Sequence, residues 1–449
     1  MTQAAPPMNR YLAAFEALEG AGAAASPAWL HRIRREAITR FAEQGFPTVR
    51  LEDWKYTNVA PIVATAFQLA DTVSTGLPAQ AIERFVVRDP VAHRLVFVNG
   101  RYSATLSSVA PLPGGVRVAN LAEALRTDAA VLDRHLGRHA ASEGTGHGFT
   151  ALSTAFAHDG AFVHLPAGVR VTAPIHLLFV GTAPAGPVLA QPRNLFVADR
   201  GSEATVVESY VGLADDTYLT NAVTEVVLGE GANLQHYKIE HESERAYHVG
   251  TTAVVQGRDS TFTSGSIAVG GALARNNLGV LLAAPGASCA LTGLYVLHGR
   301  QHVDNHTFID HAAPRCTSRQ LYKGVLDGRA RAVFNGRVTV RRDAQHTDAH
   351  QTNKNLLLSE GAEVDTKPQL EILADDVKCT HGAAVGQLGE DAVFYLRSRG
   401  LGEEAARTLL VYGFMSDVIN RITVEPIRAQ LDSLLMARLR EARAAKEPR

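Results

Sequence analysis

The chain has 449 residues, of which 46% are apolar and 20% are charged, a composition typical of a soluble globular protein with a substantial core. Its 44 basic and 45 acidic residues nearly cancel, so the net charge of −1 gives no general attraction to phosphate backbones and argues against nucleic acid as a partner. No apolar run is long enough to cross a membrane and the first residues lack the apolar segment of an export signal, so we expect a cytoplasmic protein with no membrane partner.

The first segment, about 1–150, is predicted to be a helical and mixed domain. Ser26 and Pro27 are typical of a helix start, and Gly45 is typical of a helix end. Between them apolar side chains recur every four residues, at Trp29, Ile33, Ala37 and Phe41. Further on, Asn99–Gly100 separates two strand-like runs and predicts a tight hairpin.

The middle segment, about 151–396, repeats one pattern: a turn glycine, a few small or polar residues, then a strand-like run. The marker glycines are separated by 30, 26, 29, 42 and 33 residues, at Gly201, Gly231, Gly257, Gly286, Gly328 and Gly361. A period near 30 without intervening helices favours a β-solenoid, in which stacked coils share one apolar core. A β-sandwich of many short strands remains the alternative.

The last segment, about 397–449, returns to a helical pattern, with Pro426 at a first-turn position. Five apolar side chains of the final helix fall on one face, at Ile427, Leu431, Leu434, Leu435 and Leu439. This face either caps the end of the solenoid or docks a partner. The pattern alone does not choose between them.

Several catalytic motifs are absent from the sequence. There is no Gly-x-x-x-x-Gly-Lys-[Ser/Thr] loop, no Gly-x-Ser-x-Gly elbow and no His-Glu-x-x-His helix, so any ATP hydrolysis must come from another chain. Histidines are frequent between His298 and His381, and the spacing of His346 and His350 would suit zinc on a helix. The flanking residues are strand-like, however, and four strand residues span about 13 Å. We therefore expect ordinary turn or surface histidines there.

Cys379 and His381 form a better candidate pair. If this segment is an edge strand, alternation places both side chains on one face, with Thr380 on the other. A thiolate beside an imidazole suits iron or zinc, and a cationic imidazole would lower the pKa of the thiol. Two ligands do not complete a tetrahedral site, so the others would come from elsewhere in the chain or from another subunit. The alternative is a small thiol packed beside a hydrogen-bonded histidine.

Three stretches carry a resemblance to a known family: "DDVKCTHGAAVG" at 375–386, "EDWKYTNV" at 52–59 and "FAHDGAFVHLPAGV" at 156–169. They resemble the SufB/SufD family, whose members are subunits of the SufBCD iron–sulfur cluster assembly scaffold. SufB members typically carry Cys-Glu-His-Glu where this chain has Cys-Thr-His-Gly at 379–382, so the similarity is to the SufD branch. Ala384 departs from the threonine more usual in the family.

The resemblance implies a mainly β protein: a right-handed parallel β-helix core flanked by N-terminal and C-terminal helical regions. It implies a non-catalytic scaffold subunit that pairs with a SufB-like paralogue and binds the ABC-type ATPase SufC through its C-terminal helices. His381 would face a cysteine of the partner, with Cys379 beside it, where iron and a nascent cluster gather. No cofactor would be held stably by this chain alone, and participation of a flavin in the complex stays open.

Two other functions stay open on the sequence. One is a cytoplasmic β-helix enzyme resembling a metal-dependent lyase, which its low aromatic content of 6% does not favour. The other is a homodimeric structural platform that never holds a cluster.

Overall fold

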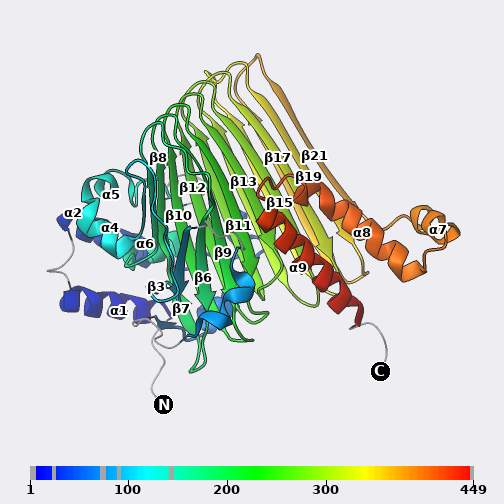
Figure 1. Cartoon of the computed structure of the whole chain (residues 1–449), viewed down its shortest axis with the longest axis horizontal. Coiled ribbons are helices and arrows are strands. Elements are labelled where there is room, and N and C mark those ends of the chain that lie inside the picture. The colour runs from blue at the N-terminus through cyan, green and yellow to red at the C-terminus, as the bar shows by residue number, and fades with distance from the viewer. Residues whose placement is uncertain (1–6, 23–26, 71–76, 88–92, 141–145, 445–449) are drawn as a thin grey trace.

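The structure is a computed structural model that describes residues 7–22, 27–70, 77–87, 93–140 and 146–444. Two largely parallel sheets form its body (Figure 1). The first, sheet A, runs through β20 (Glu363–Ile372), β18 (Arg331–Val340), β16 (His302–His311), β14 (Leu273–Leu282), β12 (Tyr247–Gln256), β10 (Tyr218–Leu228), β8 (Arg193–Ala198), β5 (Ala161–Leu165) and β4 (Arg117–Asn120), with β7 (Val188–Ala190) and β1 (Gln68–Leu69) off this path. The second, sheet B, runs through β21 (Lys378–Gly386), β19 (Asp348–Leu357), β17 (Thr317–Leu326), β15 (Ser288–Leu297), β13 (Thr261–Ala268), β11 (Asn233–His241), β9 (Glu203–Gly212), β6 (Ile175–Gly181), β2 (His93–Val98) and β3 (Arg101–Tyr102).

From β8 onward the long strands alternate between the two sheets, and each pairs in parallel with the strand that follows two places later. Ala274 of β14, for example, lies opposite Val303 of β16, one coil further along the chain. This connectivity is a β-solenoid, which confirms the fold predicted from the glycine period and excludes the sandwich.

The marker glycines explain why the period is visible in the sequence. Gly201, Gly231, Gly286 and Gly328 have φ between 64° and 78°, a backbone conformation that glycine adopts without strain. Gly257 is required by a close approach instead, since a Cβ there would lie 2.8 Å from the carbonyl oxygen of Leu228. Gly201, Gly231, Gly257 and Gly286 therefore mark the corner from sheet A to sheet B in successive coils, whereas Gly328 and Gly361 lie at the opposite corner, from sheet B to sheet A.

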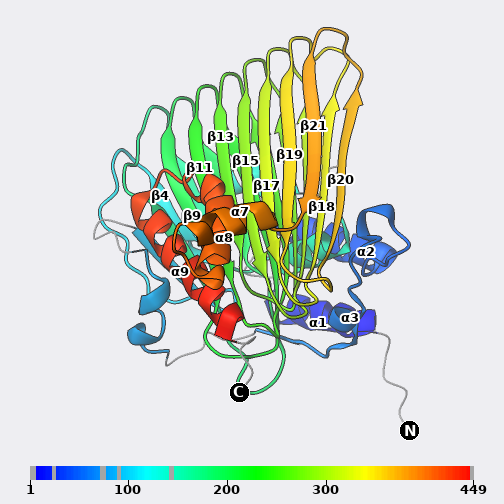
Figure 2. The ribbon, with the colours of Figure 1, turned by 90° about the vertical axis from the view of Figure 1, so that its right-hand side faces the viewer.

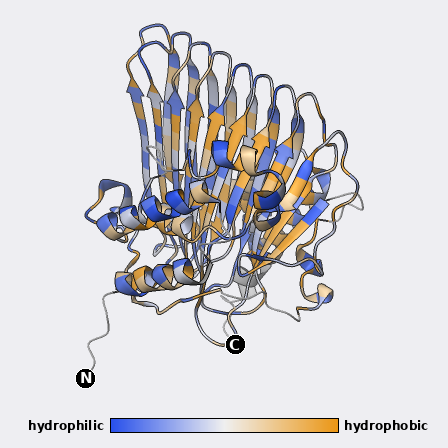
Figure 3. Ribbon diagram, turned by 90° about the vertical axis from the view of Figure 1, so that its left-hand side faces the viewer, coloured by the Kyte–Doolittle hydropathy of each residue, from blue (hydrophilic) through white to orange (hydrophobic). Residues whose placement is uncertain are grey.

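One continuous apolar cluster fills the solenoid from Leu95 to Ala374. Each coil is covered by the next, except the last, which consists of β20 and β21. That coil leaves its strand edges and part of its inner face open, and Val385 is exposed there. Figure 3 shows short blue segments that interrupt the orange ones on several strands, so polar and apolar residues share many strands.

The N-terminal region contributes to both sheets as well as supplying helices. The Asn99–Gly100 hairpin is confirmed, with φ of 50° and 78° at the turn and Phe97 paired with Tyr102. β2 pairs in parallel with β6, and β4 pairs antiparallel with β5. The helices of this region are α1 (Pro7–Gly22), α2 (Ala28–Gln44), α3 (Ala60–Ala64), α4 (Leu121–Thr127), α5 (Ala129–His135) and α6 (Gly148–Ala155), with 3-10 turns at Glu52–Trp54, Ala79–Ala81 and Glu83–Phe85.

The C-terminal helices are α7 (Glu390–Ser398), α8 (Glu403–Ile419) and α9 (Glu425–Ala444). α8 and α9 lie across the outer face of sheet B (Figure 2). Ile427, Leu431 and Leu435 are buried there, and Leu434 and Leu439 are half-buried against the same cluster. The five side chains thus pack against the outer face of sheet B of this chain and do not cover the end of the solenoid. None of the helices, within the residues that the structure describes, is long and apolar enough to span a membrane.

Candidate functional site at the open coil

Cys379 and His381 lie on β21, the edge strand of sheet B, and both continue inward-facing rows of the solenoid. Cys379 follows Ala349, which is buried in the core, and His381 follows Gln351, which is also buried. The two residues therefore share the inner face, as strand alternation predicts. Because no further coil covers β21, Cys379 is only half-buried and His381 is exposed.

Thr380 points to the opposite face and holds the strand in place. Its Oγ1 lies 2.6 Å from Nδ1 of His350 on the neighbouring strand β19, and Nε2 of His350 lies 3.0 Å from Oδ1 of Asp348. These contacts tie the outer face of β21 to β19. These contacts do not involve Cys379 or His381, which lie on the inner face.

The Cys379 thiol is not activated within this chain. Burial raises its pKa above the ordinary value, Asp348 raises it further, and a backbone hydrogen bond from Ala349 opposes both. A cationic imidazole is not among these causes, so the lowering of the thiol pKa by such a group stays a prediction. A cationic metal or a partner's positive charge would be needed to favour the thiolate.

The pair is an incomplete set of ligands. Among the described residues, no group of three or more His, Cys, Asp or Glu side chains is placed to hold a metal ion. Cys379 and His381 can supply a sulfur and a nitrogen, which suit iron and zinc, but a tetrahedral site needs more.

The other histidines singled out in the sequence have local partners. His346 sits in a turn with φ of 61°, and its Nδ1 lies 2.9 Å from Oδ2 of Asp376. His350 binds Asp348 and Thr380 instead, so the two rings engage different groups. This agrees with the expectation of ordinary turn and surface histidines.

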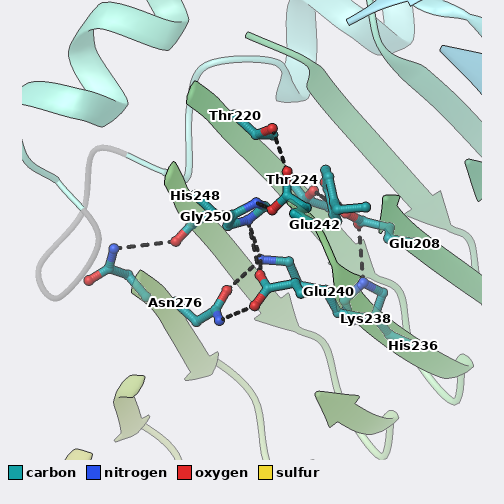
Figure 4. A network of polar contacts seen from close by, with 12 residues as sticks. Glu208, Thr220, Thr224, His236, Lys238, Glu240, Glu242, His248, Gly250 and Asn276 are labelled. Carbon is teal, nitrogen blue, oxygen red and sulfur yellow. Dashed lines mark hydrogen bonds and ion pairs between the residues drawn. The ribbon is translucent and has the colours of Figure 1, made fainter. Parts of the chain in front are cut away.

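The sequence prediction missed a polar network inside the solenoid (Figure 4). His236 Nε2 lies 3.1 Å from Oε1 of Glu208, and Lys238 Nζ lies 2.8 Å from Oε1 of Glu240 and 2.9 Å from Nε2 of His248. Burial opposes ionisation of Glu240, but Lys238 and His248 outweigh it and lower its pKa to about 2. The alternating polar residues of "NLQHYKIEH" were the available signal, since a strand places 236, 238 and 240 on one face.

We expect the free energy of unfolding to fall as the pH drops below about 6.5. Burial lowers the pKa of both His147 and His176 to about 3, so each is neutral when folded and takes up a proton on unfolding between those values. Each histidine then contributes up to about 1.4 kcal/mol per pH unit to the slope of the free energy of unfolding against pH. Urea titrations at several pH values measure this slope. His176→Phe should flatten this slope, and the wild-type slope in that variant would contradict the assignment.

Comparison with known protein families gives a consistent result across almost the whole chain. Residues 179–414 match the family model described as "SUF system FeS cluster assembly, SufBD core domain". Residues 6–177 match the model described as "SufBD protein N-terminal region".

Individual relatives are similar over most of their length. The chain is 34% identical to an iron–sulfur cluster assembly SufBD family protein of Synechocystis sp. over 413 residues, which covers 90% of each chain. It is 32% identical to the iron–sulfur cluster assembly protein SufD of Escherichia coli, covering 90% of this chain and 92% of that one. The SufD protein of Bacillus subtilis is 26% identical, covering 91% of this chain and 94% of that one.

Proposed function

The chain belongs to the SufBD family of iron–sulfur cluster assembly proteins, and from that premise we propose that it is the SufD-type scaffold subunit of a SufBCD complex. The observation that carries this proposal is the open last coil, which presents Cys379 and His381 on an uncovered inner face. In the proposal this half of the site binds iron and the nascent cluster as cargo. A SufB-like partner supplies the remaining ligands, so assembly depends on the heterodimer.

The backbone of the last coil supports pairing with such a partner. β20 and β21 are edge strands, and their outer edges carry unpaired peptide groups that can add strands of another chain. Natural edge strands are usually blunted or covered, and here Val385 lies exposed on β21. A second solenoid that continues the sheets would cover both strands and enclose the Cys379 and His381 pair.

We expect Ala383→Pro to prevent pairing with the partner while the chain stays folded. The amide of Lys378 donates to Thr347 of β19, so alternation in a parallel ladder directs the amide of residue 383 toward the open edge. Proline removes that donor but is tolerated on an edge strand. Ala383→Val, which keeps the amide, is the matched control. Co-purification measures pairing, and full recovery of the partner with the proline variant would refute an edge-to-edge interface.

The ATPase of the complex is proposed to dock on α7 and α8. Phe394 and Tyr395 of α7 are 72% and 57% exposed, and Leu401 and Leu409 are exposed nearby. Exposed aromatic side chains in a cluster are typical of protein interfaces. Because Ile427, Leu431 and Leu435 are buried in this chain's own core, a partner cannot reach them while α9 stays seated. Docking of the ATPase stays a proposal, but the proposed contact surface is now on α7 and α8 and no longer on the apolar face of α9.

The chain itself is proposed to be non-catalytic. Its sequence holds no nucleotide-binding P-loop, so the work of ATP binding falls to the partner ATPase, whose two copies would draw together and strain the heterodimer interface. Such strain would open the covered coil to iron and sulfide. A homodimer through the same open edges is the competing assembly, because a second copy of the chain presents the same unpaired strands.

A further inference from the structure

Gln351 lies directly behind His381 in the solenoid. It occupies β19, next to β21 in Figure 2, and it pairs in register with His381. Neighbouring strands are about 4.8 Å apart, so side chains in register on one face are in reach of each other. Gln351 is only 2% exposed, whereas His381 is exposed.

A chain of hydrogen bonds fixes the amide of Gln351 from behind. Its Nε2 donates to Oε1 of Gln320 at 2.7 Å, and Nε2 of Gln320 donates to Oγ1 of Thr307 at 2.5 Å. Both links are buried. The donor side of the Gln351 amide is therefore engaged with the preceding coil.

The acceptor side of the same amide is unused. Oε1 of Gln351 is buried and has no hydrogen-bond partner among the residues that the structure describes. Buried acceptors nearly always have a hydrogen-bond partner, because burial removes the hydrogen bond that water would make. An unpaired buried acceptor therefore points to a donor group that binds it in another state. The next inward-facing polar side chain in this row is His381.

Gly336 on the facing sheet makes room for this arrangement. A Cβ at Gly336 would lie 2.3 Å from Nε2 of Gln351, closer than any carbon can approach. A side chain there would push the amide out of its bonded position. The glycine and the hydrogen-bond chain thus both hold Gln351 in one orientation.

We propose that Gln351 is a positioning residue for His381. When a partner covers β21, Oε1 of Gln351 accepts a hydrogen bond from one ring N–H of His381, which sets the tautomer and leaves the other ring nitrogen to bind iron; among the described residues of the chain by itself this oxygen is unpaired. Histidines that bind metals almost always donate their second N–H to such an acceptor, and loss of the acceptor costs 10- to 100-fold in metal affinity or activity in general. The inference rests on the proposed function of His381 and adds the residue that orients it.

The test uses Gln351→Leu, which removes the acceptor that the proposal assigns to His381. Gln369→Leu is the matched control, because Gln369 lies in the same last coil and donates to Asn335 on sheet A, away from His381. Two-bond ¹⁵N–¹H spectra of the histidine-labelled chain in the reconstituted complex report the tautomer of His381. The His381 signal is assigned by its loss in His381→Asn.

The expected result is one dominant His381 tautomer in the wild type and in Gln369→Leu, and a mixture of tautomers in Gln351→Leu. The reconstituted complex should then form clusters about tenfold more slowly with Gln351→Leu alone. Unchanged His381 spectra in Gln351→Leu would overturn the inference, whatever the cluster yield. A tautomer change with normal cluster formation would leave the contact but overturn its part in iron binding, and would count against the proposed function as well.

Discussion

His381→Ala should strongly slow cluster formation by the assembled complex without disturbing the fold of the chain. The imidazole is exposed on an uncovered coil, so its removal leaves no cavity in the core. In the proposed site it removes one of the two ligands, Cys379 and His381, that the described residues of this chain would offer at the interface. We expect the rate of cluster formation to fall by at least roughly tenfold, because even loss of a supporting group around a metal site has that effect.

The measurement is the growth of visible absorbance when iron and sulfide are supplied anaerobically to the purified complex. His346→Asn is the control, since His346 is an exposed turn histidine that pairs with Asp376, and asparagine tolerates the positive φ of that turn. Thermal denaturation and partner recovery should be the same for both variants and the wild type. Normal cluster yield from His381→Ala would remove His381 from the site.

Two groups of apolar residues in the C-terminal region should give opposite phenotypes. Replacing Phe394 and Tyr395 together with serine should release the ATPase and leave the free energy of unfolding nearly unchanged, because both side chains are exposed. Leu435→Ala should instead lower the free energy of unfolding by about 2–5 kcal/mol, since its side chain is buried against the core.

Co-purification of the ATPase and urea denaturation of each variant separate the two effects. Exposed Ala437→Ser on α9 is the control for substitution on that helix. Full retention of the ATPase by the double serine variant would place the docking surface elsewhere. Denaturation of Leu435→Ala at the wild-type urea concentration would show that α9 is not seated as the structure has it.

The solenoid could be predicted from the sequence because its glycines serve one local purpose repeatedly. Gly201, Gly231 and Gly286 turn the corner from sheet A to sheet B, and Gly328 turns the opposite corner; all four have positive φ, so the same backbone chemistry recurs along the solenoid. The shared face of Cys379 and His381 followed from strand alternation, which is also local. Features set by strand alternation or by the backbone conformation of a turn could thus be predicted from the sequence alone.

Other features depend on tertiary contacts that no local pattern contains. The apolar face of α9 has the same spacing whether this chain or a partner covers it, and the structure shows that sheet B covers Leu431 and Leu435. The raised pKa of Cys379 arises from burial against neighbouring coils. Gln351 is separated from His381 by 30 residues, so its position behind that ring appears only once the coils are stacked.

The central claim is that the open coil is one half of a heterodimeric assembly site, and the composition of the native complex tests it most directly. The chain would be tagged, captured anaerobically from its own cells and weighed intact by native mass spectrometry, with identification of every subunit. We predict one second solenoid subunit of the same family and two copies of an ABC-type ATPase. Recovery of the chain alone, or only with a second copy of itself, would contradict the proposal.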